Sequence, residues 1–261
     1  MTLVLGILCS DGVVIGSDSA ATFGSGNLST IGQQYTRKIH SLQGQILYTN
    51  TGAVGISQLI MDVVGSLWLD GKLKQQVCPN ADVAMDTIGR AIVQKVGPYL
   101  QLGALQKQIL GEATQSLCKS LIALPVDHKP CLLSFDYNGA PERATTELPF
   151  VAFGSGQVIA DPFLAFLHRL LWKDVAPTVA EGRLAAAWTI EHTVKTNPGG
   201  VGGEIQLATL SIVKGNAKVE MLGEGQIAEH RQRITAAEDV LVAELRGTRE
   251  ALPPNVPAPD S

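Results

Sequence analysis

Residues 2–18 read TLVLGILCSDGVVIGSD. The apolar runs at residues 3–8 and 13–18 flank Ser10-Asp11-Gly12, and this pattern predicts an antiparallel β-hairpin. Chain ends usually fray, so a core strand beginning at residue 3 suggests that the N-terminal end has a role. Removal of Met1 would leave Thr2 with a hydroxyl and a free α-amine, the two groups of a self-activating threonine nucleophile. On this stretch alone, an ordinary edge hairpin with an incidental threonine is the alternative.

The composition indicates a folded protein with a sizeable core. Of the 261 residues, 45% are hydrophobic and 17% are charged, which excludes a disordered chain. The net charge of -4 gives no basic surface for nucleic acid. No apolar run reaches the ~18 residues that a membrane-spanning helix needs. We therefore expect no nucleic-acid partner and no membrane partner. Because no targeting leader precedes Met1 in this sequence, we expect a cytoplasmic protein.

The four cysteines, Cys9, Cys78, Cys118 and Cys131, lie in or beside apolar segments without the paired spacing of a metal site. We interpret them as buried, reduced thiols. Metal ligation is the alternative, and no metal and no cofactor is expected.

Groups of strands and pairs of helices follow one another along the chain. Apolar runs predict strands at residues 3–8, 13–18, 36–42, 45–50, 120–126, 131–137, 146–153, 204–213 and 217–222. The polar stretch 23–34 has the composition of a loop. Helical spacing predicts helices at residues 56–69, at 80–115 with a break near Pro98, at 161–171 with Asp161 as N-cap, at 178–194 behind a capping box, and at 225–246 with Gly247 as the stop.

This segregation of strands and helices indicates the α+β class. Two antiparallel sheets stacked face to face, each covered by a helix pair, would form a four-layer αββα sandwich. We expect one domain over residues 1–222. An extension over residues 223–261 would follow, consisting of a charged helix and a mobile Pro-rich tail.

Five motifs resemble the proteasome β-subunit family of N-terminal-nucleophile hydrolases. In chain order they are Thr2, the strand 12–22 containing Asp18-Ser19, the segment 36–39 containing Lys38, the turn Thr51-Gly52, and Gly154-Ser155-Gly156. The resemblance covers residues 2–222, and by organisation the chain looks similar to bacterial members such as HslV.

The resemblance implies a threonine endopeptidase with a defined set of catalytic groups. Thr2 would be the nucleophile, and the cation of Lys38 would lower the pKa of its amine and hydroxyl. Asp18 would hold Lys38 in place. The Gly52 amide would stabilise the oxyanion, and Ser155 would form a hydrogen bond near the Thr2 amine.

The resemblance also implies how a substrate binds and what the chain assembles with. Ala21, Thr22, Asn50 and Val54 would bind an unfolded polypeptide or peptide, partly by adding it as a strand. The subunits would form a homo-oligomeric ring, stacked as a double ring, and the resemblance leaves an ATPase unfoldase open as a partner.

The sequence departs from the family at two places. The loop 196–203 lacks the usual Asp and Ser, and Ala20 replaces an arginine. Asn197 or backbone carbonyls would take over the role of the loop carboxylate. A small-molecule amidase, a non-catalytic ring subunit and an inactive homologue therefore remain alternatives. Taken singly, Asp18 and Gly52 also fit ordinary turn positions, Lys38 fits a solvated cation, and residues 154–156 fit an anion-binding nest.

Overall fold

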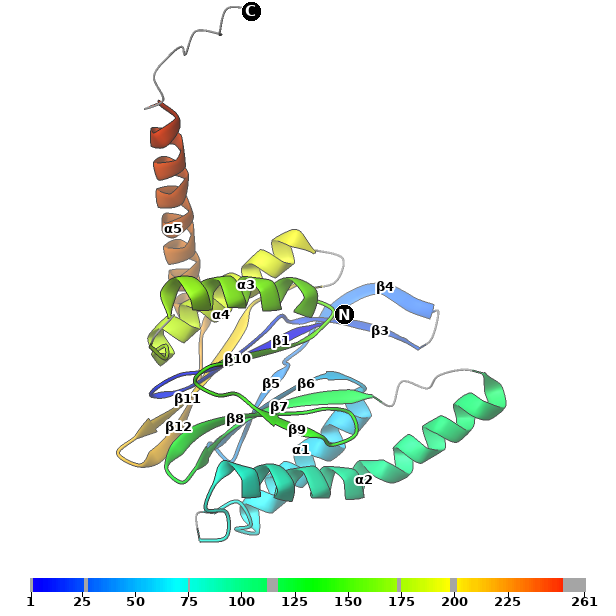
Figure 1. Cartoon of the computed structure of the whole chain (residues 1–261). Helices are drawn as coiled ribbons and strands as arrows, with labels where there is room; N and C mark the ends of the chain where they lie inside the picture. The colour runs from blue at the N-terminus through cyan, green and yellow to red at the C-terminus, as the bar shows by residue number, and fades with distance from the viewer. Residues whose placement is uncertain are drawn as a thin grey trace, which may run out of the picture.

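Two antiparallel five-stranded sheets stack face to face (Figure 1) in the computed structural model, which describes residues 2–25, 28–74, 76–111, 117–172, 175–197 and 201–250. Side chains at 22–33, 110 and 248–250 lie outside this description. The first sheet has the order β10-β1-β2-β11-β12, with β10 (Phe150–Gly154), β1 (Leu3–Leu8), β2 (Gly12–Ser17), β11 (Gln206–Val213) and β12 (Asn216–Met221). The second has the order β5-β6-β7-β8-β9, with β5 (Ile39–Leu42), β6 (Ile46–Gly52), β7 (Cys118–Val126), β8 (Lys129–Phe135) and β9 (Pro141–Arg143).

The N-terminal strand is buried on both faces. Leu3, Leu5 and Ile7 belong to the core beneath the helices, whereas Val4 belongs to the core between the sheets. Because side chains of a strand alternate between faces, β1 contributes to two of the three cores at once. This burial explains why the first strand is almost wholly apolar.

A helix pair covers the outer face of each sheet. The helices α1 (Val54–Leu69) and α2 (Ala81–Leu110) pack on the second sheet, and α3 (Gln157–Leu171) and α4 (Val179–Thr196) pack on the first. The predicted α+β class and four-layer αββα sandwich are therefore confirmed. None of the helices in the described ranges combines the length and apolarity needed to cross a membrane.

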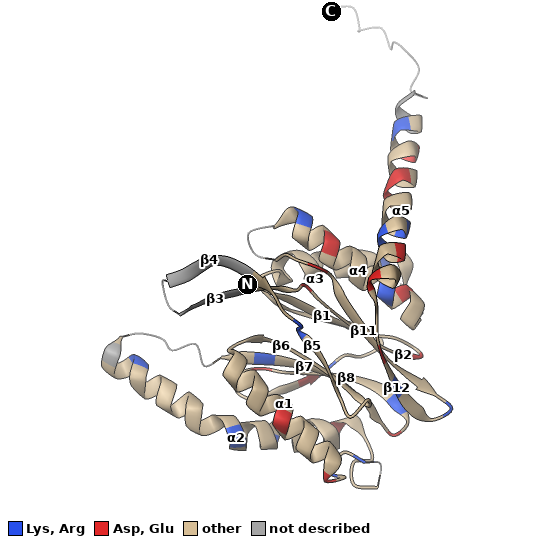
Figure 2. Ribbon diagram, turned by 180° about the vertical axis from the view of Figure 1, so that it is seen from behind, with Lys and Arg blue, Asp and Glu red and all other residues tan. Residues whose placement is uncertain are grey.

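Helix α5 (Glu224–Glu250) begins against the body and then leaves it (Figures 1 and 2). Ile227 and Ile234 are buried in the core beneath α3 and α4, and Trp188 on α4 donates a hydrogen bond to Glu238 at 3.0 Å. Farther along, Leu241 is 53% exposed. Gly247 lies within the helix and does not stop it. The domain boundary at residue 222 stays a prediction, and residues 251–261 lie outside the described ranges.

Local signals set two of the helix starts correctly. The Asn80 side chain accepts a hydrogen bond from the Val83 amide at 3.0 Å, as expected of an N-cap. At α4 the capping box is complete, because Thr178 and Glu181 each bond to the backbone of the other. These interactions satisfy amides that the first helical turn leaves without intrahelical partners.

Other predicted boundaries were wrong. Helix α3 starts at Gln157, not behind Asp161, because the chain turns into the helix directly at Gly156, whose carbonyl accepts from the amides of Ile159 and Ala160. Pro162 is accommodated inside α3, since the helix is fixed by its buried face. Similarly, α2 continues through Pro98 without a break.

The stretch expected to be a loop contains a two-stranded ribbon, β3 (Ala20–Ser25) and β4 (Leu28–Tyr35). Its polar composition suggested a loop, but backbone pairing, such as Ala21 with Gln34, does not require apolar side chains. In the first five-stranded sheet, β10 is shorter than the strand predicted at residues 146–153.

All four cysteines are buried and free, as expected. Burial raises the pKa of Cys9 and of Cys131 to about 12, so both remain neutral thiols near neutral pH.

Candidate active site

The ammonium of Lys38 connects two of the predicted site residues. Its Nζ lies 2.6 Å from Oδ1 of Asp18 and donates to Oγ1 of Thr2 at 3.2 Å. Thr2 precedes β1, Asp18 follows β2, and Lys38 precedes β5, so two sheets supply this group. The structure thus brings Lys38, from the segment before β5, to Thr2 and Asp18 of the first hairpin.

The first hairpin sets the distance between Thr2 and Asp18. Val4 pairs with Ser17, and beyond this pair the Asp18 amide donates to the Leu3 carbonyl at 3.2 Å. The Asp18 carboxylate accepts a bond from the Leu3 amide at 2.9 Å. The spacing of Thr2 and Asp18 therefore follows from the register of the hairpin.

Asp18 is completely buried and its charge is well supported. Besides Lys38 and the Leu3 amide, its Oδ2 accepts a hydrogen bond from the Gly202 amide at 3.1 Å. A buried carboxylate requires such donors, because burial removes it from water. Both carboxylate oxygens therefore have hydrogen-bond donors.

The loop 196–203, where the sequence differs from the family pattern, supports this site through its backbone. Gly202 donates to Asp18, and its carbonyl accepts from the Ala20 amide at 2.9 Å. Asn197 is the C-cap of α4, and its carbonyl accepts from the Val201 amide at 3.2 Å. The loop thus supports Asp18 through a backbone amide. A role of Asn197 or of a loop carbonyl in place of the missing carboxylate stays a prediction, and residues 198–200 lie outside the described ranges.

Burial lowers the pKa of Lys38, and the charge and hydrogen bond of Asp18 oppose that shift. The residue is only 8% exposed. Because burial reduces the screening of the ammonium by water, its electrostatic interaction with Thr2 Oγ1 is stronger than it would be at the surface. An ammonium in this position favours an anionic oxygen on Thr2.

The turn after β10 holds the backbone of Thr2. Its nitrogen donates to Ser155 Oγ at 3.1 Å, and its carbonyl accepts from the Gly156 amide at 3.3 Å. Gly154 has φ +101, and a Cβ there would lie 2.0 Å from the Thr2 carbonyl oxygen. Only glycine fits so close an approach. In the full chain the Thr2 nitrogen is a peptide nitrogen, and removal of Met1 would place a free amine at this atom.

Gly52 lies at the junction of β6 and α1. It has φ +110, and a Cβ there would lie 2.1 Å from the Leu117 carbonyl oxygen, so glycine is required for the turn itself. The next residue, Ala53, donates from its amide to the same Leu117 carbonyl at 2.9 Å. The oxyanion role of Gly52 stays a prediction.

The predicted substrate-binding residues lie on three elements. Ala21 and Thr22 are on β3, where Thr22 pairs with Gln33, and the Thr22 side chain lies outside the described residues. Asn50 is on β6 and is half-buried. Val54 opens α1 and is 68% exposed. Their contact with a substrate also stays a prediction.

Two polar residues beside the site received no role from the sequence: Ser19, quoted only as part of a motif, and Gln206, which was missed. Ser19 Oγ accepts from the Glu204 amide at 2.6 Å and so holds the glycine loop against β2. Gln206, the first residue of β11, forms hydrogen bonds with the backbone of Thr36 and Lys38. The only sequence signal for Gln206 is a polar side chain at the start of an apolar strand, which many strands share.

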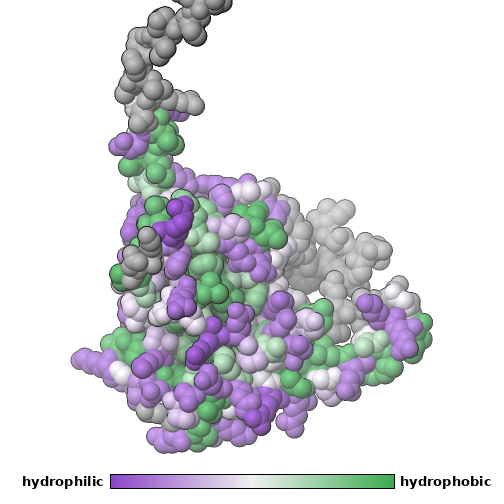
Figure 3. Space-filling view, in the orientation of Figure 1, coloured by the Kyte–Doolittle hydropathy of each residue, from purple (hydrophilic) through white to green (hydrophobic). Residues whose placement is uncertain are grey.

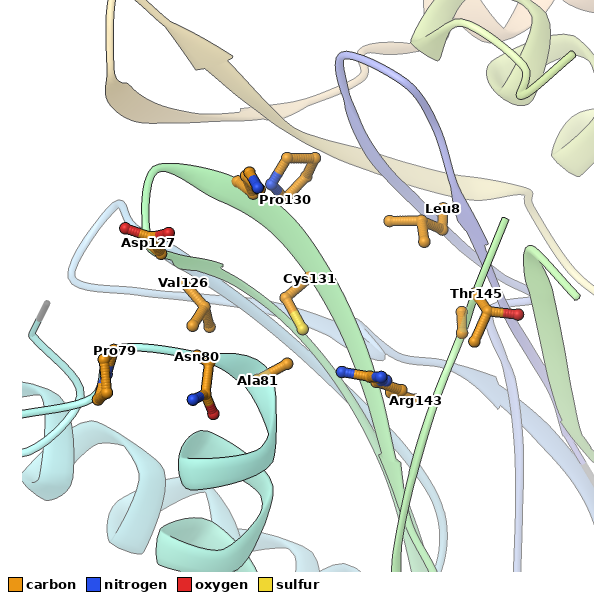
Figure 4. Close-up of a pocket in the computed structure, with 12 residues that line it drawn as sticks. Leu8, Pro79, Asn80, Ala81, Val126, Asp127, Pro130, Cys131, Arg143 and Thr145 are labelled. Carbon is orange, nitrogen blue, oxygen red and sulfur yellow. The ribbon is translucent and has the colours of Figure 1, made fainter. Parts of the chain in front are cut away.

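A cavity of about 340 Å³ lies away from this group (Figure 4). It lies at the far end of β1 from Thr2, because Leu8, the last residue of β1, lines it. None of the predicted site residues lines it. Its lining consists of Leu8, Pro79, Asn80, Ala81, Val126, Asp127, Lys129, Pro130, Cys131, Arg143, Ala144 and Thr145.

The sequence matches no protein-family model and no curated protein, whereas the fold matches many solved structures. A Gly-1 mutant of Anbu from Hyphomicrobium sp. strain MC1 is 15% identical, with a TM-score of 0.68 over 95% of this chain and 100% of that one. Anbu, an ancestral β-subunit, from Yersinia bercovieri is 16% identical, with a TM-score of 0.66 over 97% and 99%. The helical assembly of the Anbu complex from Pseudomonas aeruginosa is 17% identical, with a TM-score of 0.61 over 99% and 100%.

At these identities the likeness shows the fold alone, which this chain shares with the Anbu proteins. The prediction of a chain similar to HslV is wrong, because the structural neighbours named above are Anbu proteins, which are distinct from HslV. The five motifs describe a nucleophile and its surroundings, so they cannot distinguish one member of such a fold from another.

Proposed function

We propose that this chain is a threonine endopeptidase subunit of a proteasome-like particle, with Thr2 as its nucleophile after removal of Met1. The observation that carries the proposal is the position of the Lys38 ammonium between Thr2 Oγ1 and the buried Asp18 carboxylate. The ammonium of a surface lysine would be screened by water and would have little effect on a neighbouring hydroxyl. A buried one placed against a hydroxyl is suited to activating that hydroxyl.

The reaction would proceed through an acyl-enzyme. The free amine of Thr2, directly or through a water, takes the proton from Oγ1, and the oxygen attacks the carbonyl carbon of a peptide bond. Lys38 stabilises the oxygen as its negative charge develops, and the Gly52 amide donates to the oxyanion. The Thr2 ammonium then protonates the leaving amine, and water, activated by the same amine, hydrolyses the ester.

The substrate would be a peptide or an unfolded polypeptide. Its backbone would pair as an added strand with Thr22, Gly52 and Val54, while the side chains of Ala21, Asn50 and Val54 would contact the residue before the cleaved bond. Such pairing uses backbone N–H and C=O groups that have no partner strand. An ATPase unfoldase as a partner remains open.

We also propose that the chain is a homo-oligomer, arranged as a closed, stacked ring. The helical assembly of Anbu from Pseudomonas aeruginosa supports assembly, although it favours a helical arrangement over a closed ring. Apolar side chains on the projecting part of α5 (Figure 3) also support it, since Val240, Leu241 and Val242 are 63%, 53% and 44% exposed. A cytoplasmic location belongs to the same proposal and is supported by the four free cysteines.

An inactive homologue is the second candidate. The observation that favours it is the loop beside Asp18, which supports the carboxylate with the Gly202 amide where the family has an Asp and a Ser. A small-molecule amidase of the same fold is a third possibility, and substrate size would separate it from a peptidase.

The test is intact mass after incubation with a β-lactone or epoxyketone probe. The mature chain should begin at Thr2 and gain the mass of one probe. Thr2→Ala keeps a small residue that permits removal of Met1 but lacks the hydroxyl, so it should gain none. Full retention of Met1 on folded protein, or equal labelling of Thr2→Ala, would contradict the mechanism.

A further inference from the structure

The backbone that carries Lys38 lies outside both sheets. Strand β5 begins one residue later, at Ile39, and lies at the edge of its sheet, paired only with β6. The segment Thr36–Lys38 lies between β4, which ends at Tyr35, and β5, and it belongs to neither strand. Its backbone groups must find other partners or face water.

Gln206 supplies two of these partners from the other sheet. Its Oε1 accepts from the Lys38 amide at 2.9 Å, and its Nε2 donates to the Thr36 carbonyl at 2.6 Å. One side-chain amide thus bonds to two residues of the same segment, as the peptide group of a neighbouring strand would. A third bond, from the Thr36 amide to the Ser19 carbonyl at 2.9 Å, holds the start of the segment.

Gln206 is itself on a rigid support. It opens β11, which lies between β2 and β12 in its sheet, and pairs with Ser17, the residue before Asp18. The same two adjoining strands therefore position the carboxylate that binds the Lys38 ammonium and the amide that binds the Lys38 backbone. The backbone and the ammonium of Lys38 are therefore both positioned by β2 and β11.

We propose that Gln206 is a positioning residue, which fixes the Lys38 backbone so that its ammonium reaches Thr2 Oγ1. This inference rests on the proposed function for its catalytic consequence, but not for its geometry. The two hydrogen bonds of Gln206 go to backbone groups of Thr36 and Lys38. Gln206 acts through the Lys38 backbone.

The role requires a donor and an acceptor on one side chain of this length. Glutamate has the same size but only acceptors when ionised, so Gln206→Glu would oppose a carboxylate oxygen to the Thr36 carbonyl. Methionine has a similar length and makes neither bond, so Gln206→Met removes both with little change in volume. The two variants disturb the contact in different ways and guard against a folding failure of either.

A matched control exists at the other end of β5. Gln45 also reaches from one sheet to the other, donating from Nε2 to the Ala217 carbonyl at 3.3 Å. It lies beyond Leu42, away from Lys38. Gln45→Met should therefore reproduce the loss of an inter-sheet glutamine bond without affecting the lysine.

The first measurement is independent of activity. Trace labelling of lysines with an amine-reactive reagent, followed by peptide mass spectrometry, reports the accessibility of Lys38. In the parent, Lys38 should react slowly, because it is 8% exposed. In Gln206→Met and Gln206→Glu it should react about tenfold faster, since losing one or two hydrogen bonds favours local opening by about that factor. Unchanged labelling in both folded variants overturns the proposal, whatever their activity.

The second measurement is the rate of acylation by the β-lactone against pH, normalised to titratable sites. Both variants should acylate roughly 10- to 100-fold more slowly, through a lower maximal rate and not weaker binding. Without the nearby cation, the pKa of the Thr2 amine rises, so the acidic limb of the profile should move to higher pH. A general loss of stability would reduce the number of active sites without moving that limb. Acylation with parent rate and parent profile overturns the catalytic part of the proposal.

The two measurements separate this inference from the proposed function. A parent chain that never acylates refutes the peptidase, and faster Lys38 labelling in the variants would then still support positioning by Gln206. A parent that acylates, with variants that match Gln45→Met in both measurements, refutes positioning and leaves the peptidase intact.

Discussion

Replacing Asp18 by Asn should destabilise the fold strongly while barely changing its shape. Asp18 is completely buried and accepts hydrogen bonds from Lys38, the Leu3 amide and the Gly202 amide. An asparagine keeps one acceptor oxygen but presents an amide group to at least one of these donors. It also removes the counter-ion of a lysine that is 8% exposed.

Removing one partner of a buried ion pair typically costs about 3–5 kcal/mol. Because a chain of this length loses about 2–4 °C of melting temperature per kcal/mol, the midpoint should fall by roughly 6–20 °C. Lys38 can reduce the cost by losing its proton. Its pKa is already lowered by burial, and Asp18 is the group that raises it, so the variant lowers this pKa further.

The loss should depend on pH with a definite sign. A folded-state lysine pKa below the unfolded value means that the unfolded chain binds more protons in the window between the two values. Stability therefore rises with pH through that window. In Asp18→Asn the window should extend closer to neutral pH than in the parent, so its deficit should shrink as the buffer becomes more alkaline.

Scanning calorimetry over a series of pH values measures both effects. Asp62→Asn, at an exposed position on α1, serves as the surface control and should change the free energy of unfolding by less than about 0.5 kcal/mol. The double variant Asp18→Asn/Lys38→Met removes both charges and should be more stable than Asp18→Asn alone. A loss below about 1 kcal/mol in Asp18→Asn, or a double variant no more stable than the single one, would refute this reasoning.

Three further predictions concern the lysine, the particle and α5. Lys38→Ala should abolish peptide hydrolysis with assembly intact, and Lys38→Arg should fail too, since a guanidinium is bulkier than an ammonium; near-parent turnover in either contradicts the mechanism. Light scattering at micromolar concentration should give the mass of several chains, and a single-chain mass counts against assembly. Truncation after Gly223 removes Ile227 and Ile234 from the core and should lower the free energy of unfolding. Truncation after Glu238 should keep the fold and change the mass of the particle. Parent stability in the first variant, or parent particle mass in the second, would contradict these expectations.

Much of the fold could be predicted because its signals are local. The capping box at Thr178 and Glu181 and the N-cap at Asn80 depend on residues three apart, so the sequence contains all the information they need. The start of α3 could not be placed this way. Asp161 and Pro162 form a good local start signal, but the turn at Gly156, fixed by contact with Thr2, determines where the helix begins.

The candidate site divides in the same manner. Thr2 and Asp18 belong to one hairpin, so their separation follows from strand register and could be predicted. Lys38 was recognised only through a family pattern, since its contact spans two sheets. Gln206 could not be predicted at all, because its partner Lys38 is 168 residues away and a lone glutamine carries no pattern.

The turn that holds Thr2 also imposes an order on biosynthesis. Ser155 is 153 residues downstream of Thr2, and β1 lies between β10 and β2 in its sheet. At about 5–20 residues per second, a ribosome needs roughly 8–30 s to reach that turn after it has made the first strand. During this interval the nascent N-terminus lacks its docking partners, so the removal of Met1 that we propose can take place before Thr2 is docked. Under the proposed mechanism, the nucleophile is generated on an unfolded chain and gains its reactivity only when the late strands arrive, so a partly synthesised chain cannot attack its neighbours.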